Sequence, residues 1–535
     1  MPRGGHSVQP RRGGARTLVS LGDVREVIID GGSLDIEDVV AVAGRAATVT
    51  LAEGVAARMA PARELVERLA REERIVYGVT TGFGALASTR IAPDEIEELQ
   101  VSLVRSHAAG VGERLPPDLV RAMMLLRART LSQGHSGVRP VIVERIVELL
   151  RRDLLPSVPA QGSVGASGDL APFAHLALPI IGEGEMTDGG EPEPSALVLA
   201  RHGLEPLTLA SKEGLSLLNG TEGMLAMGVL GTARARRIAD AADLACALSI
   251  EALFGSARPF DARIHALRPH PGQAATASLI GALLEGSEIG ASHADDFDHA
   301  VQDAYSLRCA PQVHGAVRDT IGFAAETFTR ELGAVVDNPI VFPDDGDVVS
   351  AGNFHGQPLA FALDYMAIAV TELGSISERR TDRLLDPERS AGLTPFLATR
   401  PGVNSGLMLS QYTAAALVAE NRVLSHPASV ESIPTSGSQE DHVSMGWGAG
   451  RKLSQVLANT ERVIAVELMC AAAGVEQRAP LRPAHLTGRA LEIVRSRVPR
   501  LDGDRPIGAD IDAVAAILRE GRFDDLVAEA RSSGP

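Results

Sequence analysis

The sequence contains a series of long segments in which apolar residues recur at three- and four-residue spacing. This spacing places apolar side chains on one face of an α-helix. The segments are residues 61–74, 94–111, 117–152, 215–254, 315–332, 357–385, 406–424 and 443–476. Candidate strands are few and no internal repeat is visible. We therefore predict a mainly α fold, built as an elongated multi-helix bundle.

We expect three parts along the chain, and its 535 residues are long enough for more than one domain. Residues 1–22 are rich in glycine and arginine, contain no acidic residue and lack the apolar core of a signal peptide, so we interpret them as a disordered tail. We expect residues 23–222 to form a smaller mixed N-terminal domain and residues 223–535 to form the long-helix bundle domain. Because a bundle this rich in alanine often completes its core by association, we also expect an oligomer.

Charge and cysteine content exclude several classes of function. The formal net charge is −17 and no dense basic patch is present, which argues against nucleic-acid binding. Only Lys212 and Lys452 are lysines, and neither follows a glycine, so no phosphate-binding loop of the Gly-Lys type exists. Three widely spaced cysteines indicate a reducing compartment, which favours the cytoplasm. No run of eighteen uncharged apolar residues occurs, so we expect no contact with a membrane.

One acidic segment invites a metal site, because His293 and His299 flank three aspartates. The acidic residues are equally typical of a solvated loop, and no distant third ligand can be identified. We therefore predict no metal site.

The tripeptide Ala166-Ser167-Gly168 has the clearest chemical potential. Because glycine lacks a Cβ, the amide nitrogen of Gly168 can approach the carbonyl carbon of Ala166 and close a five-membered ring. Loss of water from the ring and from the Ser167 hydroxyl would leave an exocyclic methylene conjugated to an imidazolone. Such an electrophile accepts an amine.

The same segment is also typical of a helix N-terminus, with Ser167 or Asp169 as the cap and Pro172 in the first turn. The two interpretations are compatible. A helix that begins near Asp169 would point its positive end at the ring and favour the negative charge that develops there when an amine adds.

Other candidate residues are ambiguous when each is taken alone. Tyr77 lies in a glycine-rich loop and is either a turn anchor or an acid–base group. Tyr305 and Arg308 are three residues apart, on one face if helical, and a planar guanidinium suits a carboxylate ligand. His107 is typical of a helical histidine whose hydrogen bonds are satisfied. Asn219 and Phe354 are typical of turns or caps, and Glu440 is typical of a helix N-terminus.

Taken together and in order, these motifs resemble the aromatic amino acid ammonia-lyase family. They are Tyr77-Gly-Val-Thr-Thr-Gly-Phe-Gly84, Ser106-His107, Gly165-Ala-Ser-Gly-Asp169, Asn219-Gly-Thr221, Tyr305-Ser-Leu-Arg308, Asn353-Phe354-His355 and Gln439-Glu-Asp-His442. The resemblance spans roughly residues 34–520, and so many motifs in one order are not a chance match.

The resemblance implies a helical homotetramer of the ammonia-lyase and fumarase type, whose active sites combine residues from more than one subunit. Ala166, Ser167 and Gly168 would form a 4-methylidene-imidazol-5-one (MIO) group without an external cofactor. Asn219 would support the ring carbonyl, and Tyr77 would remove the β-proton of the substrate.

The resemblance also implies the residues that hold the substrate. Arg308 would clamp the substrate carboxylate with help from Tyr305. Gln302 and Phe354 would line the pocket. His107 and Glu440 would face an imidazole ring, with Glu440 also counted among the catalytic residues.

The implied reaction is elimination of ammonia from a small amino acid. A carboxylate at Glu440 suits an imidazole N–H, and Ser106-His107 makes a polar pocket, so we favour L-histidine as substrate and trans-urocanate as product. Two positions point the other way: Gln357-Pro358 resembles the tyrosine-directed branch, and Glu222 stands where many histidine lyases have glutamine. A tyrosine ammonia-lyase, an MIO-dependent 2,3-aminomutase and a non-catalytic helical scaffold therefore stay as alternatives.

Overall fold

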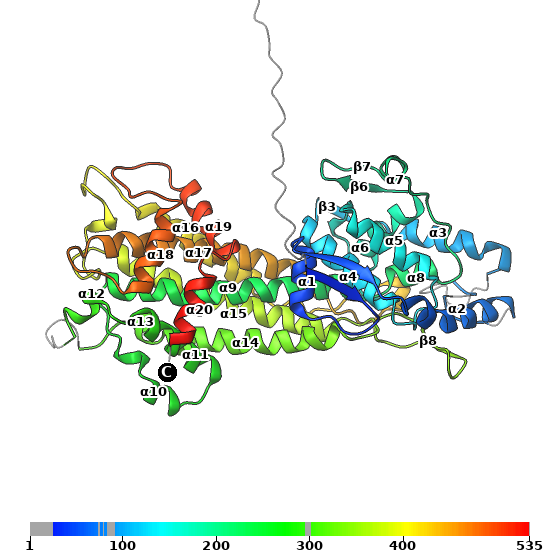
Figure 1. The fold of residues 1–535 in the computed structure, drawn as a ribbon, viewed down its shortest axis with the longest axis horizontal. Helices are drawn as coiled ribbons and strands as arrows, with labels where there is room; N and C mark the ends of the chain where they lie inside the picture. Colours follow the sequence, from blue (N-terminus) through cyan, green and yellow to red (C-terminus); the bar gives the residue numbers. More distant parts are fainter. Residues whose placement is uncertain (1–24, 73–74, 79, 83–90, 295–300, 534–535) are drawn as a thin grey trace, which may run out of the picture.

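The computed structural model describes residues 25–72, 75–78, 80–82, 91–294 and 301–533 (Figure 1). The tail expected at residues 1–22 lies outside the described residues. So do Val79, Phe83 and Gly84 of the motif that begins at Tyr77, and most of the acidic segment that ends at His299.

A bundle of long helices runs through the middle of the molecule (Figure 1). It consists of α9 (Glu222–Ala252), α14 (Ala310–Glu331), α15 (Gln357–Leu385), α16 (Met408–Leu424) and α17 (Gly446–Glu476). Helix α15 packs against α17, α14, α9 and α16, and α17 also packs against α9. Their apolar faces meet in one continuous core. The predicted elongated, mainly α bundle is thereby confirmed.

Shorter helices cover one end of the bundle, on the left in Figure 1. They are α10 (Ala262–Ala266), α11 (Pro271–Leu283), α12 (Glu288–Ala291), α13 (Tyr305–Arg308), α18 (His485–Arg495), α19 (Gly508–Arg519) and α20 (Asp524–Ser533). Helix α11 packs along α14, and α19 packs along α17.

The other end, on the right in Figure 1, carries the N-terminal part of the chain. Its helices are α1 (Ile36–Ala43), α2 (Val55–Arg71), α3 (Ile96–His107), α4 (Pro117–Leu131), α5 (Pro140–Arg151), α6 (Leu170–Ala177), α7 (Ser195–Arg201) and α8 (Glu213–Leu218). The domain boundary expected between residues 222 and 223 coincides with the start of α9, but the division into domains stays a prediction.

Short strands between the helices of the chain pair into small sheets. β1 (Arg25–Ile29) pairs in parallel with β2 (Ala47–Leu51), from Arg25 opposite Ala47 to Ile29 opposite Leu51. The antiparallel pairs are β3 (Val111–Arg114) with β5 (Pro159–Gln161), β4 (Leu154–Pro156) with β6 (Glu185–Asp188), β6 with β7 (Glu193–Pro194), and β8 (Ile340–Phe342) with β9 (Asp347–Val349).

Two segments expected as single helical stretches are each broken into two helices. Residues 117–152 divide into α4 and α5, because Gly134 and Gly137 adopt left-handed φ angles and Pro140 begins the second helix. Residues 215–254 divide at Asn219 and Gly220, between α8 and α9. The second break is important for the site, because it lets the backbone at Gly220 pair with the loop that carries Ser167.

Helix α15 is long and apolar enough to cross a membrane by length and composition alone. However, 67% of its most apolar window is buried inside the protein. This burial is what the central helix of a bundle requires.

Candidate active site

Side chains from separate parts of the N-terminal region, together with the loop before α17, line one cavity of about 140 Å³. Five of the predicted site residues lie there: Tyr77, His107, Ser167, Asn219 and Glu440. Leu103, Leu170, Leu215, Leu218 and Ser436 complete the lining. The structure thus gathers residues that are spread over more than 360 positions of the sequence into one small space.

The backbone at Gly168 packs closely against the backbone at Gly220. Gly168 has a φ of +77°, and a Cβ at this position would collide with the carbonyl of Gly220. The two glycines form a parallel bridge, and the Asp169 N–H donates to the Gly220 carbonyl over 2.8 Å. Only glycine fits this close approach with this φ. Close packing against Gly220 therefore explains why residue 168 is a glycine.

Asp169 does not cap the helix that follows it. Helix α6 begins at Leu170, as predicted, but its N-terminus has no side-chain cap. The Asp169 carboxyl is fully buried and instead accepts from the Met224 N–H over 2.8 Å and from the Ser163 hydroxyl over 3.4 Å. Burial raises the pKa of Asp169 to about 7. The expected capping role is wrong, because this carboxyl ties the loop to the first turn of α9.

Glu440 lies beside Ser167 in a closed turn. The Ser167 hydroxyl donates to Glu440 Oε1 over 3.2 Å, and the Thr435 hydroxyl donates to Oε2 over 2.8 Å. The Thr435 N–H donates to the Glu440 carbonyl over 2.8 Å and closes the turn. The interpretation of residues 439–441 as a helix N-terminus is wrong, because α17 begins only at Gly446. The sequence pattern does not reveal Thr435, because its contact with Glu440 exists only in the folded turn.

His107 ends α3 with its ring held in one orientation. The carbonyl of Leu103 lies 2.9 Å from Nδ1, and a carbonyl can only accept, so Nδ1 carries the proton. The hydroxyl of Ser106 lies 3.1 Å from the same nitrogen. Burial lowers the pKa of His107, against the opposing effects of the Leu103 carbonyl and the Glu440 charge. A neutral His107 therefore keeps Nε2 as a hydrogen-bond acceptor.

Asn219 is fixed at the break between α8 and α9. Its Nδ2 donates to the Asn338 carbonyl over 2.9 Å, and its own carbonyl accepts from Arg127 Nη1 over 2.9 Å. Arg127 also pairs with Glu222 over 2.6 Å, and both side chains are buried. Sequence reasoning missed Arg127. The available signal was an arginine directly after the apolar run of residues 122–126.

Tyr305 and Arg308 form a preassembled pair on α13, at the opposite end of the bundle from α8 (Figure 1). The guanidinium carbon of Arg308 lies 4.5 Å from the centroid of the Tyr305 ring, and its Nε donates to the Asp303 carbonyl over 2.8 Å. Gln302 lines a separate cavity of about 740 Å³. A single chain therefore does not bring these three residues to Ser167.

Phe354 also lies outside the lining of the Ser167 cavity. It is partly buried in the segment before α15. The next residue, His355, lies with its Nε2 3.2 Å from the His442 carbonyl, so this segment packs against the loop that carries Glu440.

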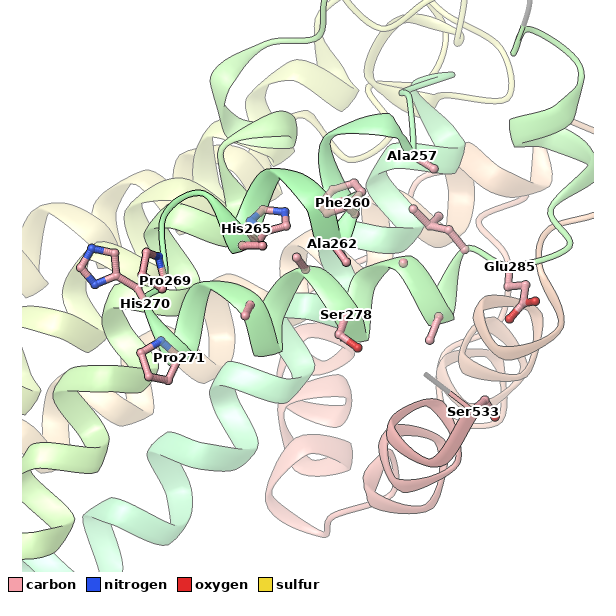
Figure 2. A pocket seen from close by; sticks show the side chains of 16 residues that line it. Ala257, Phe260, Ala262, His265, Pro269, His270, Pro271, Ser278, Glu285 and Ser533 are labelled. Atoms are coloured by element: carbon pink, nitrogen blue, oxygen red, sulfur yellow. The ribbon is translucent and has the colours of Figure 1, made fainter. Parts of the chain in front are cut away.

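A larger cavity, of about 770 Å³, lies between the segment that carries His265 and His270 and helix α11 (Figure 2). Its lining is mostly apolar and contains none of the predicted site residues. His265 there is satisfied by the Pro259 carbonyl and the Gln273 amide. This cavity therefore offers no group for the predicted chemistry.

Within the described residues, no group of three or more His, Cys, Asp and Glu side chains is arranged to hold a metal ion. The second histidine of the acidic segment, His299, lies outside those residues.

Comparisons with known proteins agree with this geometry. The model of the family described as "Aromatic amino acid lyase" matches residues 34–496. The histidine ammonia-lyase of Sorangium cellulosum (strain So ce56) is 52% identical over 508 residues, which cover 94% of this chain and 98% of that protein. The crystal structure of histidine ammonia-lyase from Trypanosoma cruzi is 43% identical, with a TM-score of 0.87, and covers 94% of this chain and 95% of that one.

A third relative has a different named activity. The tyrosine aminomutase of Streptomyces globisporus is 41% identical, with a TM-score of 0.89, and covers 94% of this chain and 99% of that one. The family match, the near full-length coverage and the gathered motif residues agree with each other. The chain belongs to the aromatic amino acid lyase family.

Proposed function

We propose that the protein eliminates ammonia from L-histidine and releases trans-urocanate. The observation that carries this proposal is the placement of the Glu440 carboxylate and the His107 ring in one cavity with Ser167. The Glu440 carboxylate and a neutral His107 nitrogen are both acceptors that suit an imidazole N–H. The 52% identity to a histidine ammonia-lyase supports the same substrate.

We further propose that Ala166-Ser167-Gly168 forms the MIO group, with no external cofactor. The left-handed Gly168 against the Gly220 carbonyl fits this cyclisation, because a side chain at residue 168 has no room. The Asn219 amide nitrogen carries two N–H groups; it donates one to the Asn338 carbonyl over 2.9 Å, and the second is the kind of donor that a ring carbonyl needs. The chemistry supplied by the group is an electrophilic carbon to which an amine adds, which turns ammonia into a better leaving group.

The residues of the cavity then have separate tasks. We assign acceptance of the substrate β-proton to the Tyr77 oxygen and support of the ring carbonyl to Asn219. Loss of the Ser167 hydroxyl as water removes the present donor to Glu440 Oε1. That oxygen becomes available for an imidazole N–H, while Thr435 still holds Oε2. His107 supplies a neutral acceptor nitrogen beside it.

We propose that the carboxylate clamp comes from another subunit of a homotetramer. Arg308 and Tyr305 lie at the far end of the bundle, and Tyr305 is 71% exposed in a single chain. An exposed aromatic strip on the same bundle supports association: the ring centroid of Tyr365 lies 6.0 Å from that of Phe361 and 6.0 Å from that of Phe323. Gln302 and Phe354 are assigned to the same composite pocket. A cytoplasmic location is supported by three cysteines that form no disulfide.

A second candidate is a tyrosine-directed lyase or 2,3-aminomutase. The 41% identity to a tyrosine aminomutase favours it, and so does Gln357, whose Nε2 donates to the Ser429 carbonyl over 3.2 Å. The distinguishing experiment incubates the purified protein with L-histidine and with L-tyrosine. Rising urocanate absorbance supports the proposal. Turnover of L-tyrosine alone, or a β-amino acid found by mass spectrometry, supports the alternative.

The mass of the peptide that carries residues 166–168 tests the remaining alternative, a non-catalytic scaffold. Cyclisation with dehydration removes two waters, about 36 Da. A peptide of unmodified mass, together with no turnover of either amino acid, would leave only the scaffold interpretation.

A further inference from the structure

The bundle core contains an ion pair that the proposed chemistry does not use directly. Arg380 of α15 and Glu467 of α17 are fully buried, and the guanidinium makes two parallel bonds to the carboxylate, of 2.5 Å from Nε to Oε1 and 2.9 Å from Nη2 to Oε2. The hydroxyls of Ser249 and Ser377 donate to the same carboxylate over 2.7 and 2.6 Å. Since desolvation offsets most of the attraction in such pairs, stability alone is a weak reason for this one.

A buried histidine also fixes the orientation of Arg380. Nη1 of Arg380 donates to His314 Nε2 over 3.2 Å, and His314 Nδ1 donates to Asp243 Oδ1 over 2.6 Å. His314 is therefore neutral, with its proton on Nδ1. Arg318 holds the second oxygen of Asp243 over 2.5 Å. The guanidinium of Arg380 is thus held on two sides, by Glu467 of α17 and by His314 of α14.

One further contact of Arg380 leaves the core and reaches α13. Nη1 donates to the carbonyl of Ser306 over 3.2 Å, and Ser306 lies between Tyr305 and Arg308. A helix of four residues is not stable by itself, because fixing the backbone of the first turn costs more conformational entropy than its one hydrogen bond offsets. The position of α13 therefore depends on its tertiary contacts. A second anchor lies before the helix, where the Ser256 N–H donates to Asp303 Oδ2 over 2.8 Å.

We propose that Arg380, held by Glu467 and His314, is a positioning residue that fixes α13 and thereby aims the Tyr305–Arg308 pair at the substrate carboxylate. This inference rests on the proposed function, which assigns Arg308 to that carboxylate. The stacking of Arg308 on Tyr305 and its bond to the Asp303 carbonyl set the plane of the guanidinium within α13. Arg380 sets where that plane lies relative to the rigid bundle.

The test is Arg380→Lys in the full-length protein. Lysine keeps the charge that Glu467 needs, but one ammonium cannot also reach His314 and the Ser306 carbonyl in the fork geometry of arginine. We expect KM for L-histidine to rise about tenfold, with kcat changed by less than about threefold, the effect of a misplaced rather than a missing clamp. Inhibition by urocanate, which carries the carboxylate, should weaken by a similar factor. Inhibition by imidazole, which lacks it, should not change.

The controls separate positioning from general damage. Arg121 is also a buried arginine that donates to backbone carbonyls, those of Val42 and Leu150, but it lies far from α13. Arg121→Lys should lower thermal stability and leave KM unchanged. The mass loss at residues 166–168 should persist in both variants. If Arg380→Lys does not assemble, Ser377→Ala leaves both charges in place and should give the same pattern at about two- to threefold.

Three results would overturn the inference: an unchanged KM in Arg380→Lys, a fall in kcat alone, or equal weakening of urocanate and imidazole inhibition. Arg308→Lys separates the role of the Arg308 clamp from the positioning role of Arg380. If it raises KM while Arg380→Lys does not, the clamp stands and the positioning role is wrong. If Arg308→Lys leaves KM unchanged, the positioning role is also wrong. If the wild-type protein turns over L-tyrosine and not L-histidine, the proposed function is wrong, and the same KM comparison is made with L-tyrosine.

Discussion

The hydroxyl of Ser167 donates to the Glu440 carboxylate over 3.2 Å, although 273 residues separate the two in the sequence. The residue that would become the electrophile therefore touches the residue that would choose the substrate. Since Thr435 holds the other oxygen of Glu440, the carboxylate keeps its position when the Ser167 hydroxyl is lost. In the proposed function, this geometry would couple activation of the amine to selection of the side chain.

Glu440→Gln tests the selection of substrate. The amide keeps the shape of the side chain but removes the charge that strengthens a hydrogen bond from an imidazole N–H. We expect kcat/KM for L-histidine to fall about 10- to 100-fold, the cost of about 1.5–3 kcal/mol for a hydrogen bond to a charged group. Urocanate absorbance measures the rate. Thr435→Ala, which only loosens the carboxylate, should give a smaller loss, and an unchanged rate in Glu440→Gln would contradict the assignment of histidine.

Ser167→Ala tests the electrophile. Without the hydroxyl no dehydration can form the methylene, so turnover should fall by at least about a thousandfold, or about 4 kcal/mol of transition-state stabilisation. The oligomer should remain folded, because Ser167 contributes one partly buried hydrogen bond, to Glu440. Size-exclusion chromatography and the mass of the peptide provide the control. Appreciable activity in this variant would refute the role of Ser167.

Gly168→Ala tests the close approach of the loop to Gly220. The added Cβ meets the Gly220 carbonyl, and φ +77° is unfavourable for alanine. We expect a lower Tm and no loss of about 36 Da from the peptide. Gly189→Ala is the matched control, because Gly189 has a similar φ of +72° but no atoms within 4 Å of the added Cβ. It should cost about 1 kcal/mol of strain and keep full activity. A dehydrated peptide in Gly168→Ala would contradict this account.

Asp169→Asn tests the buried carboxyl through the pH dependence of stability. The pKa of Asp169 is raised to about 7 by burial, so between about pH 4 and pH 7 the folded protein holds a proton that the unfolded chain has lost. The stability that comes from this proton is fully present below pH 4 and is lost as the pH rises to about 7. Asparagine stays neutral and removes this dependence.

The Tm of Asp169→Asn should therefore gain on that of the wild type between pH 5 and pH 7, and the difference should become constant above pH 7. Another buried carboxyl with a raised pKa, that of Glu251, is present in both proteins and cancels in the comparison. A Tm difference that does not vary with pH would contradict the raised pKa.

Much of the fold follows from local pattern. Residues 357–385 were predicted as a helix and α15 has those bounds, because its apolar period is uninterrupted. Residues 117–152 were not predicted correctly, because the pattern continues across Gly134 and Gly137, where the backbone turns. Periodicity reports which face is apolar, but not whether the chain bends between two apolar turns.

The helical class, the reactive tripeptide and the family resemblance follow from the amino-acid sequence alone, since each depends on residues that are close together or on the order of motifs. Three contacts are visible only in the folded protein: Asp169 holds α9 rather than capping α6, Thr435 holds Glu440, and Arg380 reaches the turn between Tyr305 and Arg308. These contacts join residues far apart in the chain. They exist because packing of the long helices brings buried polar groups together, and a buried polar group must find a partner wherever the fold supplies one.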